Sequence, residues 1–591
     1  MTAGLLIDTA SEWLAHDPDP EARRELGELI AAGSAELAER FAGPLDFGTA
    51  GLRGILGAGQ SRMNRAVVRL ATAGLARYLC DHEPGAQERG VVVGCDGRLM
   101  GRAFAEEAAR VLCAAGFKVH LCGSLCPTPI VAFGVRELGA AAGVMVTASH
   151  NPREYNGYKV YAANGAQIIP PADRLIAGAI EAAGPADAVA VADLTEARDA
   201  GRLVIFGAAL ERRYLDSVRA VCPGAAEDRS FPIAYTPLHG VGAALFELAM
   251  AEAGFGAVHV VPEQAAPDGT FPTVAFPNPE EQGTLDLVLD LARRHGAPLV
   301  LANDPDADRL AAAARSEAGD YVLLSGNELG ALLGHYVLSE ADTALHPHGL
   351  PPGQPLVVST IVSSPLLGFM AGRLGARYAE TLTGFKWLAN RALQIEAESD
   401  ARFLFAFEEA LGCVVGPAVR DKDGISAAVV LATLVARLRA RGQTLLGQLE
   451  HIARQFGLFA SRGRSIRLPG AQGQAQIQAI MAKLRAAPPA ELGGQAVLAL
   501  TDYLHGTRTA RGHAPDRVAM PASDVVAFEL AGDGRAVVRP SGTEPKIKLY
   551  LDVRESVGED EPFTAARTRA DERLRRIERD LIEAAGIAAG Q

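Results

Sequence analysis

The sequence predicts an α/β protein with three similar mixed α/β domains followed by a C-terminal α+β domain. Short apolar runs alternate with Ala-rich helical patterns, as at 91–94, 102–115 and 118–122. This alternation favours parallel strands joined by helical crossovers, because strands and helices have different hydrophobic periods. The same alternation of strand and helix patterns starts again at 231 and at 354, which indicates three domains of similar fold.

The last part of the chain has a different texture. After a long helical pattern at 425–441, residues 525–530 and 535–539 indicate short strands joined by a Gly-Asp-Gly turn. Residues 563–584 indicate a charged helix. A chain of 591 residues is too long for a single core. We therefore predict four domains, at 1–225, 226–341, 342–460 and 461–591.

Composition and charge narrow the choice of partners. The chain is 49% hydrophobic, which gives ample material for several cores. Its formal net charge of −13 argues against a general nucleic-acid surface and against contact with anionic membranes. Any phosphate must then be bound locally by placed Arg and Lys side chains. We expect the partner to be a small molecule.

Two further features predict a reducing, cytoplasmic setting. The seven cysteines are an odd number without the paired spacing of zinc sites. The first apolar stretch contains Asp8 and Glu12 and lacks a basic leader region, and no run of about 18 apolar residues occurs. We therefore expect a cytoplasmic protein.

The segment Thr147-Ala148-Ser149-His150-Asn151 directly follows the apolar run 140–146. The run is short enough for a buried strand, and Pro152 and Gly157 downstream are typical of turns. A hydroxyl at Ser149 would be held rigidly at the edge of a sheet, as a reactive serine requires. An ordinary turn is the alternative, since Ser and Asn are common before Pro.

Three aspartates, Asp304, Asp306 and Asp308, follow a strand candidate at 298–302. In an extended loop, residues two apart project to one side, so the three carboxylates would converge. Their mutual repulsion requires a cation, and an all-oxygen set suits Mg²⁺.

Two alternatives compete with this metal site. An EF-hand calcium loop needs glycine and glutamate at the positions that Arg309 and Arg315 occupy here. The other alternative is a solvated acidic turn. Arg309 favours the metal site, because it places a phosphate-binding cation beside the carboxylates.

Residues 539–546 lie between two strand candidates near the C-terminus. Gly542 lets the backbone curl so that successive N–H groups point inward. The hydroxyls of Ser541 and Thr543 and the charge of Arg539 complete a predicted phosphate nest. A simple hairpin turn is the alternative.

Two weaker segments contain donors and acceptors for a polyhydroxylated ligand. They are 383–387, with Thr383, Gly384 and Lys386, and 407–412, with Glu408. Each alone is more typical of a surface loop, and only their order along the chain gives them weight.

In sequence and in order, these segments resemble the α-D-phosphohexomutases, the family of phosphoglucomutase and phosphomannomutase. The resemblance covers nearly the whole chain, with one motif in each predicted domain. The segments 47–54, 276–280 and Glu408-Glu409-Ala410 look most like the branch that contains phosphoglucomutase 2, phosphopentomutase and glucose-1,6-bisphosphate synthase.

The resemblance implies four domains around a central cleft, with a phosphorylated Ser149 as phosphoryl donor and metal ligand. It implies one Mg²⁺ on Asp304, Asp306 and Asp308, with Arg309 beside the transferring group. The sugar hydroxyls would be bound by Thr383, Gly384, Lys386 and Glu408. The phosphate that is not reacting would be bound by Arg539, Ser541, Gly542 and Thr543. A sugar bisphosphate would be the intermediate and activator, and we expect a monomer or a homodimer.

The chain departs from the family at two points near Glu408. Ala410 stands where many relatives have serine, so one sugar contact is absent. The histidine that some relatives carry at or just beyond this motif is also missing. The general base is therefore open.

The candidates for that base are His150 and Lys159, with Arg53 placed against the reacting oxygen. An always-charged Arg is a poor proton acceptor, which favours the other two. His150 could instead only brace the serine loop. Arg98 and Thr128 could line the same cleft, although strand-end packing explains them equally well.

The first functional hypothesis is a phosphoglucomutase that interconverts glucose 1-phosphate and glucose 6-phosphate. Phosphomannomutase, phosphopentomutase and a sugar bisphosphate synthase stay open, because the sugar-binding loops of these enzymes differ by few groups. A regulator that binds sugar phosphates without turnover is disfavoured, since a mere binder has no use for a phosphorylatable hydroxyl beside a metal cage.

Overall fold

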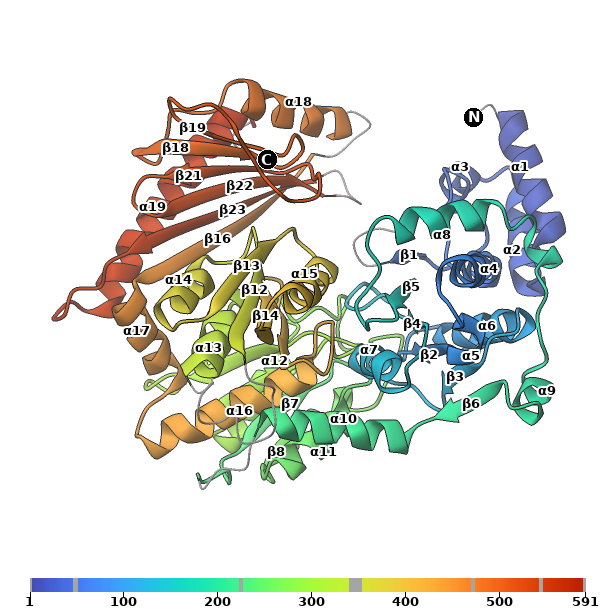
Figure 1. Cartoon of the computed structure of the whole chain (residues 1–591), viewed down its shortest axis with the longest axis horizontal. Helices are drawn as coiled ribbons and strands as arrows, with labels where there is room; N and C mark the ends of the chain where they lie inside the picture. Colours follow the sequence, from blue (N-terminus) through green and yellow to red (C-terminus); the bar gives the residue numbers. More distant parts are fainter. Residues whose placement is uncertain are drawn as a thin grey trace.

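The computed structural model describes residues 3–45, 51–222, 227–339, 353–468, 473–541 and 546–587. The described residues form four main β-sheets with helices packed around them, which confirms the predicted fold class (Figure 1). We number the domains by these sheets. The first and fourth domains lie at opposite ends of the molecule in this view, with the second and third between them.

The first sheet has the strand order β1-β5-β4-β2-β3-β6. Its strands are β1 Leu52–Ile55, β2 Val91–Cys95, β3 Val119–Cys122, β4 Ala142–Val146, β5 Tyr155–Ala162 and β6 Leu203–Phe206. The helices are α1 Ala3–His16, α2 Pro20–Ala31, α3 Glu36–Arg40, α4 Arg65–His82, α5 Ala86–Arg89, α6 Gly101–Ala114, α7 Thr128–Glu137, α8 Ala172–Glu181, α9 Leu194–Asp199 and α10 Ala208–Val221. Because β2 and β4 are parallel neighbours, the loops that follow them meet at one edge of the sheet.

The second sheet has the order β11-β10-β9-β7-β8. Its strands are β7 Ile233–Thr236, β8 Val258–Val260, β9 Leu299–Ala302, β10 Ala311–Arg315 and β11 Tyr321–Leu324, and its helices are α11 Ala243–Glu252 and α12 Asp286–His295. β7 is parallel to β8 and β9, whereas β10 is antiparallel to β9 and β11. The sheet is therefore mixed.

The third sheet has the order β13-β12-β14-β15. Its strands are β12 Gln354–Thr360, β13 Arg377–Thr381, β14 Ala401–Glu408 and β15 Gly412–Val415. The helices are α13 Gly326–Ser339, α14 Leu366–Arg373, α15 Phe385–Glu398, α16 Gly424–Ala440 and α17 Leu445–Phe456. One hydrophobic core, from Leu52 to Phe456, runs through the first three domains.

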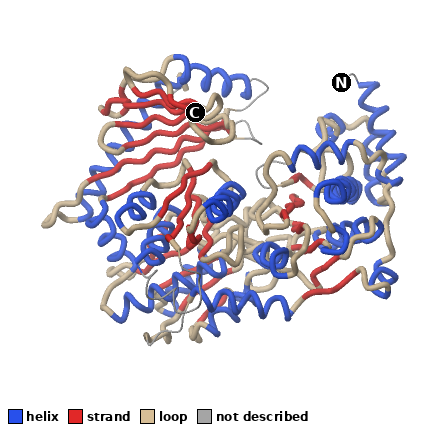
Figure 2. The backbone as a smooth tube through the Cα atoms, in the orientation of Figure 1, coloured by secondary structure: helices blue, strands red, loops and turns tan. Residues whose placement is uncertain are grey.

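The fourth sheet is antiparallel throughout, with the order β16-β23-β22-β21-β18-β19-β20 and β17 paired to β18. Its strands are the red segments that lie side by side in the upper left of Figure 2. Its strands are β16 Leu458–Arg467, β17 Glu491–Leu492, β18 Gln495–Asp502, β19 Thr507–Ala510, β20 Asp516–Arg517, β21 Val526–Leu530, β22 Gly534–Pro540 and β23 Lys546–Glu555. α18 Gly473–Ala486 and α19 Phe563–Ala585 pack against this sheet and share a separate core with it.

Two predicted boundaries differ from the structure. The boundary at 341 would leave α13 in the second domain, whereas this helix packs mainly against β14, α14 and α17 of the third. The other boundary falls inside a strand. β16 spans Leu458–Arg467 and pairs along its whole length with β23, so the boundary at 460 cuts a strand of the fourth sheet. The strand begins with three apolar residues, 458–460, but serine, arginine and glycine follow from 461 to 465, so the apolar run is too short to indicate a strand. Among the described residues, no helix is both long and apolar enough to cross a membrane.

Candidate active site

The serine loop follows β4 and places Ser149 in a strained conformation. Its φ is +53°, in the left-handed region that L-residues seldom occupy. The backbone N–H of Ser149 donates to the hydroxyl oxygen of Thr147 at 2.8 Å. Ser149 is 3% exposed, so its hydroxyl is buried at the contact between the first two domains.

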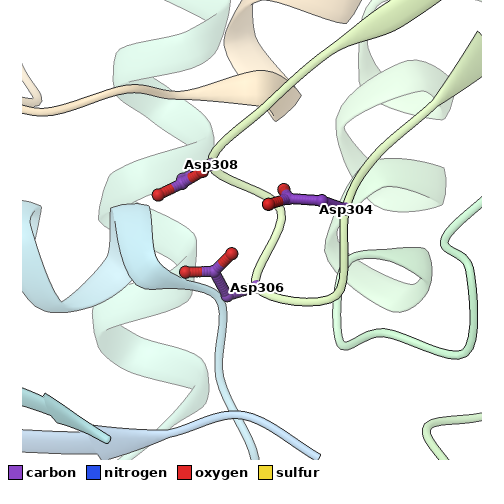
Figure 3. A group of neighbouring side chains, drawn as sticks. All are labelled: Asp304, Asp306 and Asp308. Atoms are coloured by element: carbon purple, nitrogen blue, oxygen red, sulfur yellow. The ribbon is translucent and has the colours of Figure 1, made fainter. Parts of the chain in front are cut away.

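The three aspartates follow β9 in a tight turn and not in the extended loop that the sequence suggested. Ala307 has φ +56°, and its N–H donates to the carbonyl of Asp304 at 2.9 Å. The turn still brings Asp304, Asp306 and Asp308 together, with one oxygen of each within 4.8 Å of the others (Figure 3). All three side chains are fully buried.

The serine loop and the aspartate loop are joined directly. The Ser149 hydroxyl donates to Asp304 Oδ2 at 2.7 Å. At the start of α7, the Thr128 hydroxyl donates to Asp306 Oδ2 at 2.6 Å, and its backbone N–H donates to the Asp306 carbonyl at 2.9 Å. Contacts between the first two domains therefore bring together the hydroxyl and the carboxylates.

The aspartate cluster fits a divalent cation. Asp306 Oδ1 and Asp308 Oδ1 are buried and have no hydrogen-bond partner among the described residues. Unpaired buried carboxylate oxygens are costly unless a cation binds them. An all-oxygen donor set is the one that Mg²⁺ prefers.

Two buried lysines also face the cluster. Lys159 on β5 places its ammonium 2.8 Å from Asp306 Oδ2 and 2.9 Å from Asp308 Oδ2. Lys422 lies 3.3 Å from Asp308 Oδ2 and 3.9 Å from Glu408 Oε1. Lys422 was not among the predicted site residues, and its only signal in the sequence is its place in an Asp-Lys-Asp-Gly run at the start of α16.

These charges shift pKa values in opposite directions. Burial raises the pKa of Asp304 well above its ordinary value, and repulsion from Asp306 and Asp308 adds to the rise. Burial would also raise the pKa of Asp306, but the charge and hydrogen bond of Lys159 lower it below its ordinary value. Burial would lower the pKa of Lys159, but the two carboxylates raise it, so this lysine is held as an ammonium.

His150 is in the opposite state. Its Nδ1 lies 3.2 Å from the Ser149 hydroxyl oxygen. Burial lowers the pKa of His150 well below its ordinary value, and the positive charges of Arg309 and Arg53 lower it further. A neutral imidazole can accept a proton, whereas an ammonium group cannot.

Arg53 and Arg309 surround the serine loop. Arg53 on β1 donates to Asn151 Oδ1 at 2.8 Å, and burial together with the charges of Arg98 and Arg309 lowers its pKa to about 10. The Arg309 guanidinium lies 3.2 Å from Glu280 Oε2 and 4.0 Å from Asp304 Oδ2. Two guanidinium groups thus lie where a transferring phosphoryl group would need positive charge.

The predicted sugar-binding residues come from the third domain. Glu408 ends β14 and is buried beside Lys422; its pKa is raised by burial, an effect that the positive charge of Lys422 opposes. Gly384 has φ +111° and precedes α15, which carries Lys386 in its first turn. The Thr383 hydroxyl is buried without a hydrogen-bond partner among the described residues. Within that part of the chain, no hydrogen bond links Thr383, Gly384 or Lys386 to the aspartates.

The predicted phosphate nest lies at the end of β22. Arg539 faces Lys548 across the strand pair β22–β23, and the N–H of Ser541 donates to the Lys546 carbonyl at 2.8 Å. Partial burial raises the pKa of Glu409 in the third domain, and the positive charges of Arg539 and Lys548 oppose the rise, so this end of the fourth domain faces the third. Gly542 and Thr543, like residues 47–50 of the family motif, lie outside the described residues.

A cavity of about 1050 Å³ lies between the second, third and fourth domains. Its walls include Glu280, which pairs with Arg309, and Glu409, the neighbour of Glu408. Lys548 and Tyr550 of β23 complete this end of the cavity. Ser149, the three aspartates and Arg309 do not line this cavity, so it lies beside the serine and aspartate loops and does not contain them.

The chain matches all four domain models of the phosphoglucomutase/phosphomannomutase family. The matches are α/β/α domain I at residues 44–186, domain II at 212–317, domain III at 325–455 and the C-terminal domain at 470–561. Together they span most of the chain and fall on the four sheets in order.

Curated relatives and solved structures agree with these matches. A probable phosphomannomutase of Haemophilus influenzae is 39% identical over 83% of this chain and 93% of its own. The phosphopentomutase of Mus musculus is 37% identical over 95% and 92%, and the phosphoglucomutase of Staphylococcus aureus (strain USA300) is 34% identical over 88% and 91%.

Among solved structures, the open form of parafusin, a phosphoglucomutase from Paramecium, matches with a TM-score of 0.66 at 18% identity, covering 93% of this chain and 95% of its own. At this identity the likeness shows the fold alone. The family models and the curated relatives show more: the chain belongs to the phosphoglucomutase/phosphomannomutase family, whose members are phosphomutases that act as intramolecular phosphotransferases.

Proposed function

We propose that this phosphosugar mutase moves a phosphoryl group between C1 and C6 of a hexose, converting glucose 1-phosphate to glucose 6-phosphate through a phosphorylated Ser149 and a sugar bisphosphate. One observation carries the proposal. The Ser149 hydroxyl lies 2.7 Å from Asp304, at the edge of a buried carboxylate cluster with two lysines and two arginines around it. This is the charge arrangement that phosphoryl transfer needs.

In the first half-reaction, a sugar hydroxyl attacks the phosphorus on Ser149. The bond from phosphorus to the serine oxygen breaks, the bond to the sugar oxygen forms, and the hydroxyl proton passes to His150. Arg309 and Arg53 stabilise the charge on the transferring group. Asp304, Asp306 and Asp308 with the Ser149 oxygen would hold one Mg²⁺, which when bound neutralises negative charge on the phosphoryl oxygens.

The second half-reaction requires the bisphosphate to present its other end to Ser149. Thr383, Gly384, Lys386 and Glu408 would contact the sugar hydroxyls in both orientations. Arg539, Ser541, Gly542 and Thr543 would hold the phosphate that is not reacting. The pairing of Arg539 with Lys548 at the end of β22 supports the last assignment, because it places two positive charges at one place in the fourth domain.

A pentose is the second candidate substrate. The relatives that match along almost the whole chain include proteins named phosphopentomutase and phosphoribomutase, the latter from Schizosaccharomyces pombe at 37% identity. Ala410 also removes one hydroxyl that a hexose could have used. Mannose phosphates and a net synthesis of sugar bisphosphate are the remaining alternatives.

The test is a coupled assay with glucose, mannose and ribose 1-phosphates at equal concentration, each with and without added glucose 1,6-bisphosphate. A mutase on glucose requires the largest kcat/KM with glucose 1-phosphate and stimulation by the bisphosphate. A larger kcat/KM with ribose 1-phosphate would replace the hexose by a pentose. Accumulation of bisphosphate in step with consumption of a separate phosphoryl donor would indicate a synthase.

A further inference from the structure

The geometry points to Arg98 as the positioning residue of the phosphoryl-transfer step, a role that rests on the proposed function of Ser149. Arg98 lies in the loop after β2, and its side chain is fully buried. It does not touch the carboxylate cluster through any hydrogen bond of the described residues. Its effect on the reaction would pass through the backbone of the serine loop.

The Arg98 guanidinium donates hydrogen bonds to four backbone carbonyl groups of that loop. Nη1 donates to the carbonyls of Pro152 at 2.9 Å and Tyr155 at 3.1 Å. Nη2 donates to the carbonyl of Asn151 at 2.6 Å and to that of Ser149 itself. Four carbonyl oxygens that converge on one point repel each other unless a cation with several donors sits between them.

This contact explains how Ser149 keeps its unusual backbone. At φ +53° the serine is in a conformation that persists only where its surroundings fix it. Arg98 binds the carbonyl oxygens of Ser149 and Asn151, on both sides of His150. Without it, the loop could relax to an ordinary conformation, and the serine oxygen would leave its place 2.7 Å from Asp304.

Asp96 fixes Arg98 from the first domain. Its Oδ2 lies 3.4 Å from Arg98 Nε and accepts the Thr147 hydroxyl at 2.6 Å, and its Oδ1 accepts the backbone N–H of Arg98 at 3.2 Å. Thr147 in turn binds the N–H of Ser149. The acid therefore holds both the guanidinium and the start of the serine loop.

The second domain supplies the remaining contacts around Arg98. Together with the contacts of Asp96 they form a clamp on the Arg98 side chain. The Arg98 guanidinium stacks over the Phe271 ring, with its centre 5.1 Å from the ring centroid. A Cβ at Gly269 would lie 2.6 Å from the Gly97 carbonyl oxygen, so the two loops fit without space between them. The second domain, which supplies the aspartates, thus also packs against Arg98, the residue that holds the backbone of Ser149 in place.

Arg98→Lys tests the inference, because lysine keeps the charge but cannot reach four carbonyls. Arg229→Lys is the matched control: Arg229 is also buried, also lies 5.1 Å over a phenylalanine, Phe255, and also donates to a backbone carbonyl, in the second domain away from the serine. Both variants should lose some thermal stability. Only Arg98→Lys should have a lower rate of phosphoryl transfer.

The measurement starts from enzyme labelled on Ser149 with radioactive glucose 1,6-bisphosphate. We expect Arg98→Lys to slow single-turnover transfer from phosphoserine to the sugar by about 100-fold, the cost of a misplacement of about 1 Å. KM should change less than about threefold, since the residues assigned to the substrate are untouched. Phe271→Leu, which keeps a smaller apolar side chain and removes the aromatic face, should slow transfer by a smaller factor.

Each outcome decides the matter. If the folded, label-accepting fraction of Arg98→Lys transferred at the wild-type rate, or if Arg229→Lys slowed transfer equally, the positioning role would be overturned. If Arg98→Lys failed to fold, transfer at the wild-type rate in Phe271→Leu would overturn the clamp. If wild-type enzyme took up no label on Ser149, the proposed function would fail instead, which separates the two failures.

Discussion

The first three domains and the fourth differ in how their parts are held together. A single hydrophobic core runs through the first three, and polar contacts of 2.6–2.9 Å join the serine loop, α7 and Lys159 to the aspartate loop. The fourth domain has its own core and meets the third through a small apolar cluster that includes Leu382 and Tyr503. Ion pairs also join these two domains, as in Arg535 with Glu380 at 3.2 Å and Arg567 with Glu328 at 2.8 Å.

This difference matches the two tasks of the proposed reaction. Transfer between Ser149 and a sugar oxygen tolerates little displacement, so its groups belong in the continuous core. The phosphate that is not reacting must be held, released and bound again from the other end of the sugar. A separately folded domain suits that task, because its attachment can change without disturbing the transfer site. Substitutions of the transfer groups in the first two domains should therefore lower kcat, and substitutions of the phosphate-binding residues in the fourth should raise KM.

Ser149→Ala gives the largest expected effect. Without the nucleophile, turnover should fall below about 10⁻⁴ of the wild-type value, measured in the coupled assay. The thermal unfolding midpoint should change little, because one hydroxyl contributes little to the core. Ser217→Ala removes a comparable hydroxyl, bonded to the Tyr214 carbonyl in α10, and should leave turnover unchanged. Wild-type turnover in Ser149→Ala would exclude the phosphoserine mechanism.

Asp306→Asn should follow, with a loss in kcat of about 100-fold or more. The amide keeps the shape but removes one of three negative charges, so binding of Mg²⁺ weakens. A titration of activity with Mg²⁺ should show a higher half-saturating concentration, and a chelator should abolish activity in the wild type. Asp216→Asn, an exposed carboxylate of α10, serves as control. An unshifted titration would remove Asp306 from the metal site.

Arg539→Ala tests the other region. A charge-assisted hydrogen bond to phosphate contributes about 1.5–3 kcal/mol, so KM should rise by about 10- to 100-fold. kcat should change by a smaller factor, because the transfer site stays intact. Arg511→Ala, an exposed arginine of the same domain, should leave KM unchanged. If kcat fell while KM stayed constant, the division of tasks between the two regions would be wrong.

The sequence predicted much of the regular structure. Apolar runs gave β2, β4, β9 and β12, because buried parallel strands are nearly continuous in hydrophobic residues. The sequence predicted less where tertiary contacts decide whether a segment forms a strand. β16 has only isolated buried positions along an edge strand, so its start was placed too late.

The candidate site shows the same limit. Motif order identified Ser149 and the aspartates, but not that Ser149 is buried or that Ala307 turns the metal loop, since both depend on the packing of the first domain against the second. Lys422 had no periodicity to mark it. Strand-end packing was a sufficient account of Arg98 until its four carbonyl contacts were visible.

Each of the two regions contains a buried aspartate with a shifted pKa, and the two pKa values are shifted in opposite directions. Burial raises the pKa of Asp96 from 3.8 to about 6, although Arg98 and Thr147 oppose the rise. Burial would also raise the pKa of Asp502 in β18, but hydrogen bonds from His505 and Arg485 lower it below its ordinary value. The continuous core thus holds a carboxyl that resists ionisation, whereas the fourth domain holds one that favours it.

The two acids should therefore give opposite dependences of stability on pH. The folded state binds the Asp96 proton more tightly than the unfolded chain, so the stability from Asp96 is full below pH 3.8 and is lost as the pH rises to about 6. The contribution of Asp502 is present above its ordinary pKa and is lost as the pH falls through the lowered value. Between pH 4 and 7, the unfolding midpoint of Asp96→Asn should rise relative to the wild type as the pH rises, by a few degrees. The unfolding midpoint of Asp502→Asn should fall relative to the wild type only when the pH rises out of the acid range. If the unfolding midpoints of the two variants changed with pH in parallel, the electrostatic contrast between the regions would be contradicted.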